Sequence, residues 1–173
     1  MSARSRTVLV VPGLDDFAVT RWPQRVPGVR RVAAVDRSVP DLNRWAASVA
    51  TAIDGCREAP LVVAHGFGAL AALRATFLFE RRVAGMMLVA PDDPDRHGVL
   101  ARLPATPLPY PTLVVASRDD RGIKITKAGA LATRWGSRLV VTDRLDDDRW
   151  PEGDRLLRAF AAELVPRAIA NAA

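Results

Sequence analysis

The chain has 173 residues, 49% hydrophobic and 25% charged, a balance typical of one globular domain. Its net charge is +6, but the basic residues are nearly all scattered arginines and no DNA- or RNA-binding signature accompanies them. Nucleic acid is therefore not the expected partner. The single cysteine, Cys56, excludes an internal disulfide and favours the cytoplasm. No apolar run approaches the ~20 residues that a membrane span needs, so no membrane association is expected.

The first third of the chain predicts alternating strands and helices. Thr7–Val11 is uniformly apolar and β-branched, which is typical of a central parallel strand. Asp15–Arg25 is expected to be a loop that passes into a short helix. Val32–Val35 is expected to be a second strand. Leu42–Ile53 places its apolar residues on one face, which predicts a helix that Asp41 can cap.

The rest of the chain continues the alternation, with a long connection from Pro91 to Pro111. Strands are expected at Leu61–Ala64, Val83–Ala90, Thr112–Ala116 and Arg138–Val141, and helices from Gly68 to Phe79, over Lys124–Trp135 and from Pro151 onward. An acidic loop is expected over Asp143–Trp150. The pattern predicts one domain over residues 1–173, with flexible ends at 1–6 and 167–173. Its fold class is α/β, a three-layer α/β/α sandwich around a mostly parallel sheet of about six strands.

The stretch from Pro60 to Ala72 is the most informative part of the sequence. A short apolar strand is followed at once by the turn His65–Gly68, and an Ala- and Leu-rich helix begins directly after it. Strand, sharp turn and helix form the nucleophile elbow of α/β-hydrolases, in which the central residue of G-x-S-x-G carries the reactive hydroxyl. Here the central residue is Gly66, which has no side chain.

Several motifs together resemble a known family. They read T-V-L-V-V-P-G-L at the start, L-V-V-A-H-G-F-G at the elbow, P-T-L-V-V-A-S-R-D-D, L-A-T-R-W-G-S-R-L-V and, near the end, W-P-E-G. With Trp22, they look like the small YdeN-like serine hydrolases, in the order and spacing of that family from Thr7 to Phe160. The resemblance implies a compact α/β-hydrolase fold.

The resemblance also implies where a catalytic triad would lie. The serine would fall at Gly66 and the acid at Asp120, after the fifth strand. The histidine would come shortly before W-P-E-G, but residues 143–150 contain none. Two of the three triad positions therefore depart from the family pattern. A serine restored at position 66 alone is not expected to restore activity, because no base is supplied.

Other residues offer weaker candidates for the chemistry. His65 is expected to be a structural histidine beside the site, and proton transfer is its alternative role. His97, in the long connection, is expected to be a surface histidine and could alternatively act as a displaced base. Ser117 reads as a turn residue, and Cys56 lies at the wrong end of the sheet.

The oxyanion hole can survive the loss of the serine because its donors are backbone N–H groups. They are expected at Phe67 and at Leu14 or Asp15. The helix from Gly68 points its N-terminus at the same place, which attracts an anion such as a carboxylate. The aspartate clusters at 92–95 and 146–148 do not have metal-ligand spacing, so neither a metal nor a cofactor is expected.

These observations favour a family member that has lost catalysis and acts by binding a small apolar ester- or carboxylate-like ligand, or a protein. One alternative is an active esterase of small esters with a non-standard site, using His65 or His97 with water or a displaced serine. The other is a protein-interaction module, which would use Trp22, Trp45 or Trp150 if they prove exposed.

Overall fold

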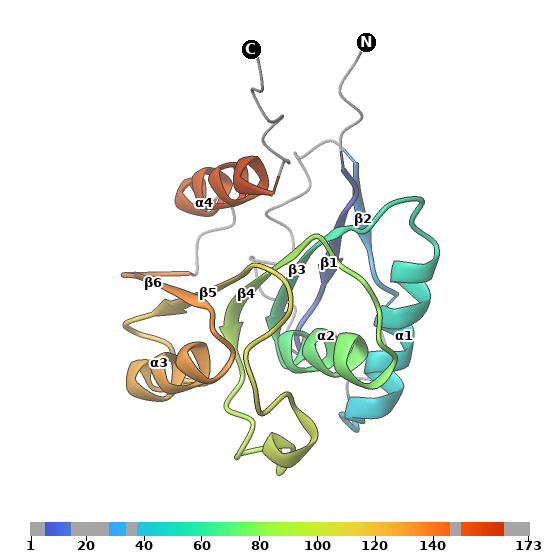
Figure 1. The fold of residues 1–173 in the computed structure, drawn as a ribbon. Coiled ribbons are helices and arrows are strands. Elements are labelled where there is room, and N and C mark those ends of the chain that lie inside the picture. Colours follow the sequence, from blue (N-terminus) through green and yellow to red (C-terminus); the bar gives the residue numbers. More distant parts are fainter. Residues whose placement is uncertain (1–5, 15–27, 34–37, 146–149, 165–173) are drawn as a thin grey trace.

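One six-stranded sheet forms the centre of the computed structural model, which describes residues 6–14, 28–33, 38–145 and 150–164 (Figure 1). The strand order is β2-β1-β3-β4-β5-β6, and every neighbouring pair is parallel. The strands are β1 (Val8–Val11), β2 (Val29–Arg31), β3 (Leu61–Gly66), β4 (Gly85–Pro91), β5 (Thr112–Ser117) and β6 (Arg138–Thr142). Because both faces of the central strands are covered, β1 and β5 are buried along their whole length.

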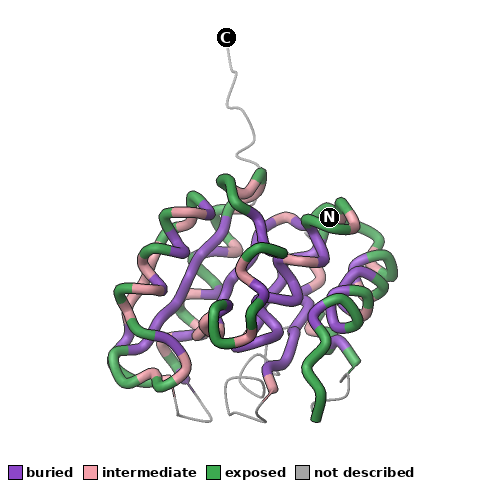
Figure 2. The backbone as a smooth tube through the Cα atoms, turned by 90° about the horizontal axis from the view of Figure 1, so that it is seen from below, coloured by how far each residue is buried: buried purple, intermediate pink, exposed green. Residues whose placement is uncertain are grey.

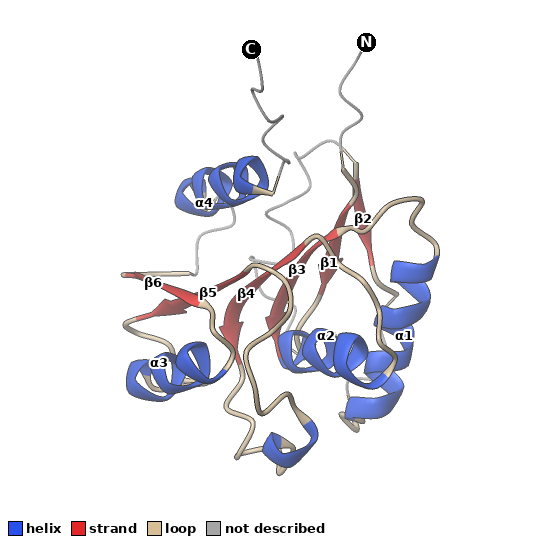
Figure 3. Ribbon diagram, viewed as in Figure 1, coloured by secondary structure: helices blue, strands red, loops and turns tan. Residues whose placement is uncertain are grey.

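Within the described residues, four α-helices cover the two faces of this sheet (Figure 3). They are α1 (Leu42–Asp54), α2 (Phe67–Leu78), α3 (Ile125–Arg134) and α4 (Pro151–Glu163), with a short 3-10 helix, η3, at Leu100–Arg102. The first three pack in one core with one face of the sheet, and α4 packs in a second core with the other face. The predicted three-layer α/β arrangement with a parallel sheet is therefore confirmed.

The two cores follow the alternation of side chains along the strands. In β1, Leu9 and Val11 point to the core of α1 to α3, whereas Val8 joins the core of α4. Figure 2 shows this buried interior running along the strands, with exposed residues on the outer sides of the helices. Trp45 and Trp135 are the largest fully buried side chains of the described residues.

The second strand lies three residues earlier than the sequence predicts. β2 spans Val29–Arg31, not Val32–Val35, and Val32 is buried just beyond it while its N–H bonds to the carbonyl of Val10. β2 is an edge strand, so Arg30 and Arg31 can face solvent, and apolar character is a poor guide to its position. The final two residues of the predicted strand lie outside the described residues, as does the predicted short helix within Asp15–Arg25.

The helices agree closely with the sequence prediction. α1 begins at Leu42, where the Asp41 carboxylate accepts hydrogen bonds from the N–H groups of Asn43 and Arg44 at 2.9 and 3.0 Å. In α4, Leu157 and Phe160 are buried, and Leu156 and Leu164 are partly buried against the same core. Among the described residues, no helix has the length and hydropathy to cross a bilayer.

Candidate active site

Gly66 ends β3 and α2 begins at the next residue, so the chain turns sharply from strand to helix. The glycine has φ 53° and ψ −127°, a conformation that costs a residue with a side chain about 1–3 kcal/mol. A Cβ built at this position would lie 3.2 Å from Asp92 Oδ1 and 3.7 Å from the Cα of Gly13. The elbow geometry predicted from the sequence is thus present, with glycine at its central position.

Two further glycines allow the turn after β1 to approach the elbow closely. A Cβ at Gly68 would lie 2.1 Å from the carbonyl oxygen of Pro12, which no real contact permits. A Cβ at Gly13 would lie 2.7 Å from His65 Nδ1. The half-buried His65 ring therefore lies against the backbone of the β1 turn.

The expected oxyanion residues come from these same two segments. Phe67 is the first residue of α2 and is buried, and Leu14 is partly buried against the main core. Both therefore belong to the carboxyl edge of the sheet. Asp15, the other expected donor, lies outside the described residues.

Asp120 follows β5 at the same edge. Its Oδ1 accepts a hydrogen bond from the N–H of Gly122 at 2.6 Å, and its Oδ2 is buried with no hydrogen-bond partner in the described part of the chain. In a catalytic triad, the acid accepts a hydrogen bond from the histidine and orients it as the base. Asp120 forms no hydrogen bond with either of the two histidines, His65 and His97. A Cβ at Gly122 would lie 3.1 Å from Asp120 Oδ1 and 3.8 Å from Asp92 Oδ1, so both carboxylates lie beside Gly122.

A second carboxylate, which sequence reasoning did not assign to the site, lies closer to Gly66. Asp92 directly follows β4, and its Oδ2 lies 2.9 Å from His97 Nε2. The ring of His97 packs edge-on against Phe67, with centroids 4.9 Å apart and an interplanar angle of 66°. The only available signal was the position of Asp92, since the residue after a parallel strand lies at the edge where ligands bind.

Of the other candidate nucleophiles, Cys56 lies where the sequence suggests, whereas Ser117, expected in a turn, is the last residue of β5. Ser117 is buried, and its hydroxyl donates to Asp119 and, at 3.1 Å, to the carbonyl of Asp143. The thiol of Cys56 follows α1 and bonds the carbonyl of Ala52 at 3.3 Å, away from the elbow. Within the described ranges no group of metal-ligating side chains could hold an ion.

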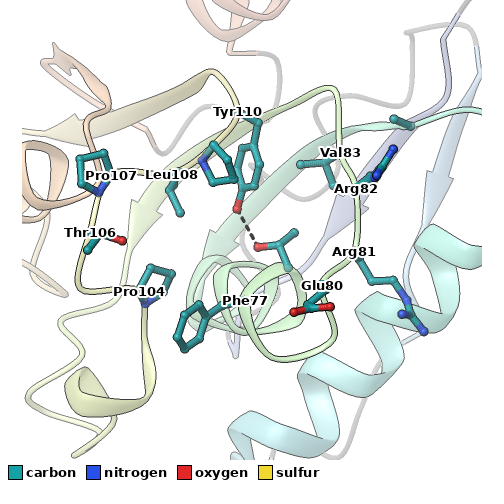
Figure 4. Close-up of a pocket in the computed structure, with 13 residues that line it drawn as sticks. Phe77, Glu80, Arg81, Arg82, Val83, Pro104, Thr106, Pro107, Leu108 and Tyr110 are labelled. Carbon is teal, nitrogen blue, oxygen red and sulfur yellow. Dashed lines mark hydrogen bonds between the residues drawn. The ribbon is translucent and has the colours of Figure 1, made fainter.

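A cavity of about 800 Å³ lies at the opposite edge of the sheet (Figure 4). It lies between the C-terminal end of α2 and the segments that lead into β4 and β5, and its lining includes Phe77, Arg82 and Pro107. Tyr110 and Thr76 share a hydrogen bond of 2.6 Å at its wall, and burial raises the pKa of Tyr110 to about 12. Since Gly66, Asp92 and Asp120 follow the carboxyl ends of their strands, this cavity is not part of their site.

The parallel sheet, the strand order and the elbow define the α/β-hydrolase fold. A family model described as serine hydrolase matches residues 8–159. The chain belongs to this serine hydrolase family.

Solved structures agree with this assignment. A YdeN-like hydrolase from Pectobacterium atrosepticum is 31% identical over 95% of each chain, with a TM-score of 0.86. The ydeN gene product of Bacillus subtilis is 16% identical over 91% of this chain and 100% of its own, with a TM-score of 0.68. Est816, described as an N-acyl homoserine lactone degrading enzyme, is 14% identical over 91% and 93%, with a TM-score of 0.69, and shares the fold. No match is found among curated proteins.

Proposed function

We propose that this member of the serine hydrolase family is a pseudoenzyme that binds a small ligand at the carboxyl edge of its sheet without serine catalysis. The observation that carries the proposal is Gly66 at the centre of the elbow. An acyl-enzyme needs an oxygen or sulfur nucleophile at this place, and glycine supplies neither. Loss of a triad nucleophile lowers turnover by about a million-fold in the best-studied case.

The environment of the Asp120 side chain supports the same proposal. Its Oδ2 has no hydrogen-bond partner among the described residues, and the sequence has no histidine between residues 98 and 173. The proposed acid therefore has no base to orient. One substitution in the triad would already abolish serine catalysis. Departures at two of the three triad positions therefore favour a natural loss of catalysis.

The backbone donors of Phe67 and Leu14 are proposed to remain as an oxyanion hole that receives a carbonyl oxygen of the ligand. Of the two expected ligand types, the ester is favoured over the carboxylate. The Asp92 and Asp120 side chains lie beside Gly66 and Gly122, and their negative charges would repel the negative charge of a carboxylate ligand bound there.

The one cysteine, Cys56, fits a reducing compartment, and we propose the cytoplasm as the location of the protein.

A second candidate function is hydrolysis at a non-standard site, and the Asp92–His97 pair is the observation that favours it. The pair lies beside Phe67, close enough for one carboxylate oxygen to contact a group over Gly66. The third candidate, an interaction surface built on tryptophans, is not favoured. Trp45 and Trp150 are 0% and 3% exposed, and Trp22 lies outside the described residues.

Hydrolysis of p-nitrophenyl acetate and butyrate separates the first two functions. The proposed function predicts no burst of nitrophenolate and a rate no more than about a thousand-fold above that of water, which is what an oxyanion hole and binding alone supply. A burst that equals the enzyme concentration, or steady turnover that co-purifies with the protein through several columns, would contradict it.

A further inference from the structure

The carboxylate of Asp92 occupies a special place relative to Gly66. Its Oδ1 lies 3.2 Å from the point where a Cβ of residue 66 would be, nearer than any other described atom outside the two neighbouring residues of the chain. A hydroxyl oxygen one bond beyond that carbon reaches hydrogen-bonding distance of Oδ1. The position of the missing serine hydroxyl therefore has an acceptor beside it.

His97 holds this carboxylate from its other side. The Nε2–Oδ2 distance is 2.9 Å, and both side chains are about three-quarters buried, at 23% and 26% exposed. In this geometry the imidazole donates its Nε2–H to Asp92, which fixes the plane of the carboxylate. A hydroxyl over Gly66 would complete a row of hydroxyl, carboxylate and imidazole, whereas a serine triad has the imidazole in the middle.

The loop that carries His97 is tied down at several points. The Arg96 guanidinium donates to the carbonyl of Arg121 at 2.9 Å, and Asp95 forms an ion pair with Lys127 of α3. Val99, two residues beyond His97, is buried in the main core. Because the loop is anchored to α3 and to the core, the imidazole is positioned before any ligand arrives.

We propose that Asp92 is a displaced proton acceptor for a hydroxyl lying over Gly66, and that His97 is its positioning residue. In this chain the hydroxyl belongs to water or to an alcohol group of the bound ligand. The inference rests on the proposed absence of a nucleophile from the protein, but not on whether the ligand reacts. It also changes the expectation from the sequence, since a serine restored at position 66 would have a base.

The test is the variant Gly66→Ser with a fluorophosphonate probe, followed by intact mass. The serine oxygen would form a bond to phosphorus, the P–F bond would break with loss of fluoride, and the hydroxyl proton would pass to Asp92. Gly66→Ala is the matched control, because it has the same Cβ without the hydroxyl. We expect Gly66→Ser to be labelled at residue 66 at least about 100-fold faster than any site in Gly66→Ala.

Second substitutions in the Gly66→Ser background separate the two roles. Asp92→Asn should slow labelling about 100-fold, because an amide accepts no proton. His97→Ala should slow it about 10-fold, and His97→Gln should recover most of that loss, because its amide can still donate to Asp92. Asp54→Asn, a carboxylate in an ion pair with Arg81 away from the site, should label like Gly66→Ser.

Two results would overturn the inference. One is a Gly66→Ser protein that unfolds cooperatively at a temperature near that of wild type but takes no label. The other is labelling that Asp92→Asn leaves unchanged. Labelling of the wild-type protein would instead contradict the proposed function, so the two failures can be told apart.

Discussion

At the scale of single residues, glycines fix the geometry of the site. Gly66 accepts a positive φ at the elbow, and Gly68 allows the first turn of α2 to touch the backbone of Pro12. The second contact is made by rigid main chain, so a side chain at position 68 cannot be accommodated by a rotamer change. The approach of β1 to α2 therefore depends on Gly68.

Gly68→Ala is expected to lower the free energy of unfolding by about 3 kcal/mol or more, because its Cβ would lie 2.1 Å from the Pro12 oxygen. Gly129→Ala, another helical glycine, is the matched control. Its Cβ would meet only Leu139 at 3.8 Å, and it should raise stability by about 0.5–1 kcal/mol. Urea denaturation measures both. Equal effects of the two substitutions would refute the close approach.

The titration of Tyr110, the only tyrosine in the sequence, tests the burial of a single side chain. Burial raises the pKa of Tyr110 to about 12, and the hydrogen bond with Thr76 opposes this to a smaller extent. Because the folded pKa lies above the unfolded value of about 10, the stability due to the neutral phenol is present below pH ~10 and is lost as the pH rises toward 12. Absorbance at 295 nm should show a midpoint near 12. A midpoint near 10 with native circular dichroism would contradict the burial.

Single residues also mark the limit of what the sequence could predict about the site. Gly66 was singled out because strand, turn and helix are local, and Asp120 because the family resemblance implies an acid after the fifth strand. The Asp92–His97 pair was not assigned, because its contact with Phe67 is made by a loop folding back over another element. His97 remained one of two histidines without a known neighbour, and only the packing of that loop gives it one.

At the scale of elements, α1 shows how a local signal fixes a boundary. The Arg44 backbone N–H, and to a lesser extent that of Asn43, lowers the pKa of Asp41 below 3.8 by hydrogen bonding to the carboxylate. The cap was predicted because Asp directly precedes the apolar face of the helix. The predicted position of β2 was wrong by three residues, because an edge strand that carries Arg30 and Arg31 has no comparable local signal in the sequence.

Asp41→Ala should lower the thermal stability at neutral pH, because the N–H groups of Asn43 and Arg44 lose their acceptor. Since the folded pKa of Asp41 is lowered, the charged cap stabilises the fold above pH ~3.8, and that contribution is lost as the pH falls through the folded value. Asp41→Asn keeps an oxygen acceptor and should lie between the two proteins. A difference between wild type and Asp41→Ala that persists unchanged at pH 2 would argue against this cap.

At the scale of the whole molecule, alternating apolar strands and amphipathic helices were sufficient to predict the parallel sheet and its layers. Short-range sequence patterns locate the helices and the buried strands along the chain. The rule that strand–helix–strand connections are right-handed then leaves few possible topologies. The sheet then brings Gly66, Asp92 and Asp120 to one edge, since β3, β4 and β5 are adjacent and parallel. The fold thus has the layout of a hydrolase, with glycine at the centre of its elbow.

The most direct test of this account is intact-mass analysis of the purified wild-type protein after treatment with a fluorophosphonate, beside an active serine hydrolase as a control. We expect the control to gain one phosphonyl group per chain while the mass of this protein stays unchanged. Stoichiometric addition of one phosphonyl group, mapped to a single residue of the wild-type chain, would contradict it.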